Sequence, residues 1–533
     1  MGVYLNPGND AFGRARNSEI YVDKTGLLAL TNKVIDTKQN CICVSRPRRF
    51  GKSMAAEMLV AYYGRECDSS ELFRHYKIAQ CEDYGKHLNH YNVIALNMQN
   101  FLSISKSIEE LTSYTQSGII EELQEIYPGK LSREEKFLSM ALEKLYSRTK
   151  ERFVFVIDEW DCIFRESKYS SEEQKKYLDF LRNLLKDRVY VSLVYMTGIL
   201  PIKKYGTHSA LNMFDEYSMT NPGEYAEYVG FTEQEVEALC DRYQMDFEKE
   251  KEWYDGYVFE DNLHIYNPKS VVDSMRRKKF SSYWTQTETY EALKIYIDMN
   301  FDGLKDAIVR MIAGEGVVIN TERFQNDMTT FGSRFDVLTL LVHLGYLAFD
   351  SKTSKVFIPN TEILGEFRIA IESEQWKDVI ASIEKSERIL QATWEQDAQT
   401  VAELIDEVHQ ENTSILTYNN ENDLSCVISL AYYNAIKEYT KVREFPSGKG
   451  FADIVFIPRR HSDKPAIVVE LKYNQSAVGA IAQIKERKYV DSLKEYQGNL
   501  LLVGINYDRS TKQHECVIEC CRLDQREGSW TED

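Results

Sequence analysis

The sequence predicts an α/β protein with an α/β region at each end of the 533-residue chain and a helical middle. Two observations predict the first region: an apolar run before Gly51-Lys52-Ser53, and a second apolar run, Val154 to Ile157, that ends in two acids. The third observation is a helix, three strands, a helix and two strands after residue 421. Strands alternating with helices favour a parallel sheet that binds ligands at the carboxyl ends of its strands.

The loop that ends in Gly51-Lys52-Ser53 has the pattern of P-loop nucleotidases. A helical pattern starts directly after it, and the first N–H groups of a helix can bind phosphate. Lys52 can neutralise the β/γ-phosphate oxygens, and the Ser53 hydroxyl can ligate Mg²⁺. We expect ATP to bind here, through Arg46, Arg48, Arg49, Phe50, Gly51, Lys52, Ser53 and Met54. Arg46 stands where the usual pattern has its first glycine, and the alternative is a basic turn without a ligand.

The second apolar run supplies the acids that a nucleotidase needs. Asp158 is expected to hold Mg²⁺ through water, and Glu159 to polarise the attacking water. Thr197, at the end of a strand over 189–196, is expected either to sense the γ-phosphate or simply to start a turn. Arg48 and Arg49 can act as arginine fingers within the chain or toward a neighbouring subunit, or can lie on the surface.

Several motifs resemble the bacterial AAA-ATPase-like family, whose loop also lacks the first glycine. They are Tyr21-Val-Asp-Lys-Thr25, Arg46-Pro-Arg-Arg-Phe-Gly-Lys-Ser53, Thr197-Gly-Ile-Leu200, Trp253-Tyr-Asp-Gly-Tyr257 and Tyr266-Asn-Pro268. Members of this family often end in a PD-(D/E)xK nuclease-like domain. The resemblance therefore implies an N-terminal AAA-like P-loop ATPase and a C-terminal nuclease-like α/β domain.

We expect five segments along the chain. An ATPase core over 1–204 precedes a helical lid over 205–298, whose aromatic residues favour core packing over base stacking. A winged-helix-like unit follows over 299–365; its helix, 337–344, is too apolar to read DNA, so a packing role is favoured. A polar helical connector over 366–412, suited to a hinge or linker, leads to the nuclease-like domain over 413–533.

The C-terminal region carries a second set of acids. Asp453 lies on one predicted strand, and Glu470 and Lys472 lie on one face of the next, because side chains alternate along a strand. Two carboxylates facing each other across paired strands can hold Mg²⁺ or Mn²⁺, and Lys472 can stabilise charge that develops on a phosphate. The alternative is an ordinary surface ion pair.

The resemblance extends this set. Glu421 matches the accessory carboxylate of the nuclease family and Gln483 matches its helix glutamine. Gly448 and Gly450 allow a tight turn beside Asp453. These matches imply a nuclease fold, with cleavage of nucleic acid as its expected activity.

Composition limits the partners. A formal charge of −18 excludes a surface that is basic all over, so DNA contacts must use local patches such as 276–279 or 459–461. A solvated turn without a ligand explains each of these patches equally well. The ten cysteines do not form a disulfide framework, and His514, Cys516, Cys520 and Cys521 are better explained as buried groups than as a metal site. No secretion signal and no apolar run long enough for a membrane span are visible, so a cytoplasmic protein is expected.

Three functions remain open. The first is a nuclease controlled by ATP and acting on DNA, in defence or mobile-element biology. The second is an ATP-driven switch whose nuclease-like domain holds nucleic acid without cutting. The third is a scaffold that senses a protein partner, and a homo-oligomer is compatible with all three.

Overall fold

The computed structural model forms two compact units. The first comprises residues 1–293 and 318–366, and the second comprises residues 294–317 and 367–533. The described residues are 2–166, 168–202, 204–205, 208–209, 211–284, 290–299, 301–322, 324, 328, 331–372, 376–412, 421–447, 450–459, 462–487, 493, 499–524 and 529–532.

A five-stranded parallel sheet organises the first unit. Its order is β2 (Asn92–Asn97), β3 (Phe153–Asp158), β4 (Val191–Gly198), β1 (Cys41–Ser45) and β7 (Asp215–Tyr217). The register pairs Thr197 with both Val44 and Asp158, so β1, β3 and β4 end at the same level. The loops that follow these three strands therefore meet at one edge of the sheet.

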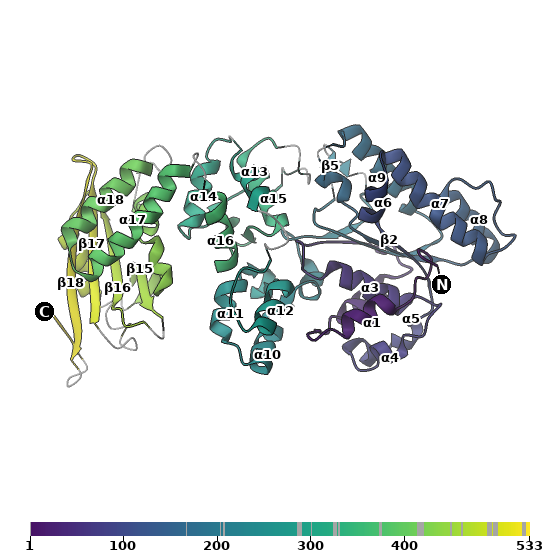
Figure 1. The fold of residues 1–533 in the computed structure, drawn as a ribbon, viewed down its shortest axis with the longest axis horizontal. Helices are drawn as coiled ribbons and strands as arrows, with labels where there is room; N and C mark the ends of the chain where they lie inside the picture. The colour runs from purple at the N-terminus through teal and green to yellow at the C-terminus, as the bar shows by residue number, and fades with distance from the viewer. Residues whose placement is uncertain are drawn as a thin grey trace. The chain divides into compact units, whose positions relative to one another are not determined.

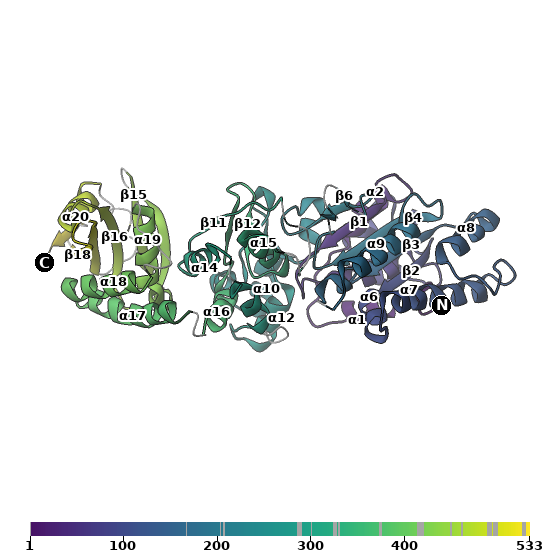
Figure 2. The ribbon, with the colours of Figure 1, turned by 90° about the horizontal axis from the view of Figure 1, so that it is seen from above.

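Helices cover both faces of this sheet, as an α/β sheet requires. Figure 1 and Figure 2 show α1 and α3 on one side and α6, α7 and α9 on the other. The helices up to β4 are α1 (Asp10–Arg16), α2 (Gly26–Val34), α3 (Lys52–Tyr63), α4 (Ser70–Phe73), α5 (Tyr84–His87), α6 (Met98–Ile104), α7 (Ile108–Ile126), α8 (Leu138–Thr149) and α9 (Ser171–Leu185).

A small lid region follows the sheet and has its own apolar core. The strands β8 (Phe231–Thr232), β10 (His264–Tyr266) and β9 (Tyr257–Val258) form an antiparallel sheet in that order. The helices α10 (Glu233–Tyr243), α11 (Phe247–Tyr254) and α12 (Pro268–Arg277) pack beside it. Thr232 and Glu235 form a capping box that starts α10.

The segment expected to be winged-helix-like is divided between the two units. Residues 318–366 belong to the first unit and contain α15 (Arg334–Leu344), β12 (Ala348–Asp350) and β13 (Lys355–Phe357). As predicted, α15 ends at Gly345, which adopts φ 89°. Its side chains from Asp336 to Leu344 are all buried, which supports a packing role for this helix. The remaining elements near the boundaries are α13 (Tyr290–Ile297), α14 (Leu304–Ile312), β11 (Val317–Val318) and α16 (Thr361–Ala370).

The second unit is built on a six-stranded mixed sheet. Its strands, in spatial order, are β14 (Tyr439–Ser447), β15 (Gly450–Pro458), β16 (Ala466–Tyr473), β17 (Asn499–Asp508), β18 (Gln513–Asp524) and β19 (Ser529–Glu532). Only the β16–β17 pairing is parallel, and α20 (Ala477–Glu486) makes this crossover. Ile481 and Ile484 of α20 pack on Val468 and Val455, so α20 covers the face that these side chains share.

The predicted connector is part of this second unit. Its helices α17 (Lys377–Trp394) and α18 (Ala398–Asn412) pack against each other, and α18 also packs on β18, while α17 packs on α19 (Glu421–Ala431). Each buries an apolar stripe, such as Ile383 and Ile389 on α17 and Leu404 and Val408 on α18. These apolar side chains are shielded from water only when the two helices pack on the rest of the unit, so the segment is not a free linker. Among the described helices, none is long and apolar enough to cross a membrane.

Candidate active sites

The first site lies where β1 meets α3. Gly51 adopts φ 94°, a left-handed conformation that side chains with a Cβ disfavour, and it turns the chain into α3. No side chain caps the N-terminus of α3, so its first N–H groups remain available for an anion. The buried Lys52 ammonium donates to the Pro47 carbonyl at 2.9 Å, and burial lowers the pKa of Lys52. A phosphate oxygen is a stronger partner for this ammonium than the carbonyl.

The structure brings the two expected magnesium ligands together. The Ser53 hydroxyl donates to Asp158 Oδ2 at 2.7 Å, although the two residues are 105 positions apart. Burial raises the pKa of Asp158, and the hydrogen bond from Ser53 opposes this rise. A divalent ion at this point would be held by one hydroxyl and one carboxylate oxygen, a donor set that suits Mg²⁺.

Glu159 has a partner that the sequence did not reveal. Its carboxylate forms an ion pair with Arg165, which also lies 3.8 Å from the buried Asp161 carboxylate. The i, i+4 spacing from Asp161 was the available signal, but it is common on protein surfaces. Arg165 therefore fixes the direction of the Glu159 side chain.

A cleft of about 750 Å³ opens above the loop. Arg48, Arg49, Phe50, Gly51, Lys52, Ser53, Met54 and Glu159 all line it. Its lining also includes the rings of Phe12 and Tyr21, in edge-to-face contact at 6.0 Å, and charged residues such as Lys24 and Asp273. The cleft thus combines basic groups that suit phosphate with aromatic rings that suit a flat base.

Two expected nucleotide contacts lie elsewhere, which corrects the sequence-based assignment. The Arg46 guanidinium is fully buried 5.2 Å from the centre of the Phe259 ring and donates to the Ser45 carbonyl at 2.9 Å. The buried Thr197 hydroxyl donates to the Val44 carbonyl at 3.0 Å. Neither side chain lines the cleft, because both are used to hold the strand ends together.

Lid residues and the region around α15 hold the loop from outside. Phe50 packs edge-to-face on Tyr257 at 5.4 Å, and the Tyr257 hydroxyl donates to the Gly345 carbonyl at 2.6 Å. The Trp284 indole donates to the Arg48 carbonyl at 3.2 Å. The backbone of the loop therefore cannot change without disturbing contacts to both regions.

The second site lies on β15 and β16. The register pairs Ile454 with Val469, and its continuation places Asp453 opposite Glu470. Glu470 and Lys472 share the face of Val468, which α20 covers. Asp453 shares the face of Val455 in the same core, so all three polar side chains are on one side. Asp453 Oδ2 accepts a hydrogen bond from the Leu471 amide at 2.7 Å.

Glu470 is the centre of this second site. It is 1% exposed, its Oε1 contacts Lys472 Nζ at 3.1 Å and the Gln483 amide, and its Oε2 has no hydrogen-bond partner among the described residues. Burial, and then the charge of Asp453, raise the pKa of Glu470 to about 7. Burial also raises the pKa of Asp453. Two carboxyl groups that resist ionisation, one with an orphaned buried oxygen, fit a divalent cation that would neutralise both.

Gly504 permits the contact between Gln483 and Glu470. Gly504 pairs with Glu470, and a Cβ there would lie 2.4 Å from the Ala477 carbonyl of α20. Only glycine lets α20 approach β17 this closely, and this approach brings Gln483 over the site.

Some predicted residues lie outside the description, and two others were missed. Glu421 begins α19, but its side chain is outside the described residues, as is Gly448. Arg443 and Arg487 stabilise the ionised form of Asp453. Arg487 follows Gln483 by four positions, a helical spacing that was visible in the sequence.

Two family models match the two regions that carry these sites. Residues 8–207 match the family model described as a predicted AAA-ATPase (AAA-ATPase-like), and residues 420–516 match that of the PD-(D/E)XK nuclease superfamily. The chain carries an AAA-ATPase-like domain and a PD-(D/E)XK nuclease-superfamily domain. This confirms the resemblance and the α/β fold class. No curated protein matches the chain.

Two solved structures resemble the chain weakly. A Walker-type ATPase of Pyrococcus abyssi is 14% identical, with a TM-score of 0.33; the match covers 66% of this chain and 97% of that one. The Aeropyrum pernix ORC2 protein, in complexes with ADPNP and ADP, is 11% identical, with a TM-score of 0.30; the match covers 68% and 98%. The assignment of the two domains depends on the family models and not on these structures.

Proposed function

We propose that the AAA-ATPase-like domain binds and hydrolyses ATP and that its nucleotide state controls Mg²⁺- or Mn²⁺-dependent cleavage of DNA by the nuclease-superfamily domain. The observation that carries the ATP assignment is one cleft that is lined by Lys52, Ser53 and Glu159 and also by the aromatic rings of Phe12 and Tyr21. Lys52 would contact the β/γ-phosphates, Ser53 and Asp158 would hold the metal, and Glu159, oriented by Arg165, would take the proton of the attacking water.

The observation that carries cleavage is the orphaned Glu470 carboxylate oxygen opposite Asp453. Asp453 and Glu470 would hold the divalent ion, which when bound polarises the scissile phosphate and activates water. Lys472 contacts Glu470 and would stabilise the charge that builds up on phosphorus. Gln483 orients the Glu470 carboxylate, and Arg487 adds positive charge beside a polyanionic substrate.

For this control, the contacts around the nucleotide loop give the nucleotide a part of the first unit to act on, and all of them lie within that unit. Trp284 and Tyr257 contact this loop directly, and Tyr257 also binds Gly345 at the end of α15. A ligand shifts a conformational equilibrium only by binding the two states differently. A γ-phosphate that orders the loop would favour one arrangement of these contacts over the other.

The decisive experiment measures cleavage of plasmid and single-stranded DNA by the purified chain, with and without ATP and with Mg²⁺ or Mn²⁺. We expect Asp453→Ala and Lys472→Ala to abolish cleavage. Asp463, an exposed acid between β15 and β16, supplies the control, and Asp463→Ala should cleave DNA as the wild type does. Lys52→Ala should lose ATP binding, and its control Lys38→Ala should keep it.

Each outcome separates the three functions. DNA binding without cleavage in the wild type would replace the nuclease by a switch that holds DNA. Absence of DNA binding would leave the protein-partner scaffold. Cleavage that is unchanged in Lys52→Ala would refute control by ATP while leaving the nuclease assignment intact.

A further inference from the structure

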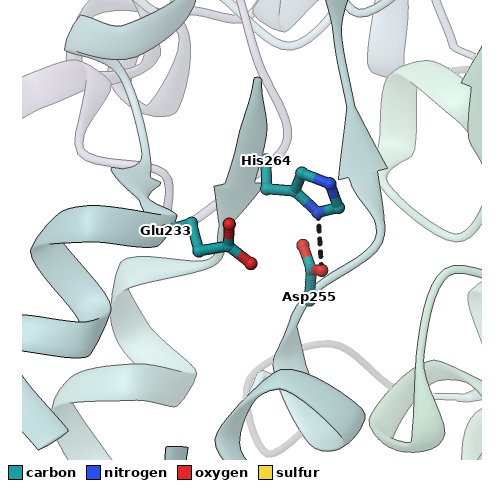
Figure 3. A group of neighbouring side chains, drawn as sticks. All are labelled: Glu233, Asp255 and His264. Carbon is teal, nitrogen blue, oxygen red and sulfur yellow. Dashed lines mark hydrogen bonds and ion pairs between the residues drawn. The ribbon is translucent and has the colours of Figure 1, made fainter. Parts of the chain in front are cut away.

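Three polar side chains converge in the lid region, away from both sites above. Figure 3 shows Glu233, Asp255 and His264 directed toward one another from three different elements. One ligand atom from each lies within 4.8 Å of the others. Glu233 is the first residue of α10, Asp255 follows α11, and His264 begins β10. The small sheet brings them together, because Thr232 pairs with Ile265.

The hydrogen bonds within the described residues leave one of these oxygens without a partner. Asp255 is 6% exposed, and its Oδ2 contacts His264 Nδ1 at 2.7 Å. Its other oxygen, Oδ1, is buried with no hydrogen-bond partner. A buried carboxylate oxygen without a donor is costly, whereas a cation satisfies it. In Figure 3 the Asp255 carboxylate lies beside both other side chains.

We propose that Glu233, Asp255 and His264 bind a divalent metal ion, and that the ion is Zn²⁺. One imidazole nitrogen and two carboxylate oxygens suit Zn²⁺ better than Mg²⁺, which prefers oxygen donors alone. Three protein ligands and a water complete a tetrahedral site. The contact of 2.7 Å between His264 and Asp255 must open to roughly 3.4 Å, the separation of two tetrahedral ligands about 2.1 Å from zinc.

A neighbouring lysine has to move for this to happen. Lys251 Nζ lies 2.5 Å from Glu233 Oε1 and neutralises it in the absence of an ion. The Lys251 side chain is 40% exposed, so it can turn into solvent when the cation arrives. Zinc then replaces one positive charge by two, next to two carboxylates.

The ion would add a further link between parts of the lid that the small sheet and its apolar core already hold together. It would link the start of α10, the chain after α11 and β10. The backbone next to Asp255 has little freedom to move, because Gly256 has φ 115° and packs closely on Pro359. A Cβ at Gly256 would lie 2.2 Å from the Pro359 carbonyl oxygen. Tyr257, two residues after Asp255, packs on Phe50 of the nucleotide loop, so the expected role is to stabilise the lid beside that loop.

The test uses the full-length chain, stripped with a chelator and kept in excess Mg²⁺ to fill oxygen-only sites. Zn²⁺ is titrated by calorimetry and Co²⁺ by its visible absorption. The wild type should bind one equivalent of Zn²⁺ at this site. We expect His264→Gln and Glu233→Gln to lower the affinity for this equivalent by at least about tenfold, the smallest effect usual for substitutions that disturb a metal site. The exposed residues His90 and Glu237 supply matched controls, His90→Gln and Glu237→Gln, which should bind as the wild type does.

Thermal unfolding gives the second measurement. Zn²⁺ should raise the Tm of the wild type and of both controls, because it binds only the folded lid, and should not raise the Tm of Glu233→Gln. If His264→Gln fails to fold, Glu233→Gln decides, since the Glu233 side chain is 36% exposed and its replacement buries no new group. Equal Zn²⁺ affinity in Glu233→Gln and the wild type would overturn the proposal.

Discussion

Replacing Glu470 by Gln should remove metal binding and cleavage but stabilise the metal-free protein above neutral pH. The pKa of Glu470 rises from 4.5 to about 7 on folding, so the folded state disfavours its ionised form. Unfolding free energy therefore falls as the pH rises from about 4.5 to about 7. At about 1.36 kcal/mol for each pKa unit, the ionised group costs roughly 3 kcal/mol above that range.

The net gain in the variant is smaller. Lys472 loses its charged partner at 3.1 Å, and the new amide nitrogen replaces a buried oxygen that has no partner. We assume that these two losses offset about half of the stability gained by removing the buried charge. The free energy of unfolding of Glu470→Gln should then exceed that of the wild type by about 1–2 kcal/mol at about pH 8. A domain of this size shifts its Tm by about 2–4 °C for each kcal/mol.

The assay compares the Tm of the wild type and Glu470→Gln in chelator at about pH 4 and about pH 8. The two proteins should melt together at the lower pH, where Glu470 is mostly protonated in both the folded and the unfolded state. The variant should melt higher at the higher pH. A Tm difference that does not depend on pH, or a wild type that is more stable at about pH 8, would refute the burial argument.

Three further changes test the local geometry. Gly51→Ala should cost about 1–2 kcal/mol at its left-handed position and weaken ATP binding in a nucleotide titration; wild-type affinity would contradict the loop geometry. Arg165→Ala should lower kcat for ATP by about tenfold with little change in KM, because it orients Glu159, and Arg165→Lys should recover part of the rate in a phosphate-release assay. Gly504→Ala should push α20 away, cost about 1–3 kcal/mol and slow cleavage by displacing Gln483; an unchanged Tm would argue against the close approach.

Local pattern was sufficient for the parts of the protein that depend on short stretches of chain. Gly51-Lys52-Ser53 between a strand and a helix predicts a phosphate site, because the loop, the ammonium and the hydroxyl are adjacent in the sequence. The same reasoning placed Glu470 and Lys472 on one face of β16, since the period of a strand is two. The strand predicted to carry these two residues is β16, whose side chains from Ala466 to Lys472 are all buried.

Tertiary structure decided what depends on pairing between distant segments. Arg46 was expected to contact the nucleotide and Thr197 either to do so or to start a turn, yet Thr197 donates to the Val44 carbonyl of the paired strand and Arg46 lies buried beside Phe259. The polar composition of α17 and α18 suggested a linker, but both helices are part of the second unit. Their apolar stripes pack within it, against each other and against α19 and β18. The Glu233, Asp255 and His264 cluster was invisible beforehand, because its members come from three elements that only the folding of the small sheet brings together. Sequence spacing determines which groups share a helix or a strand, whereas register and packing determine which groups face one another.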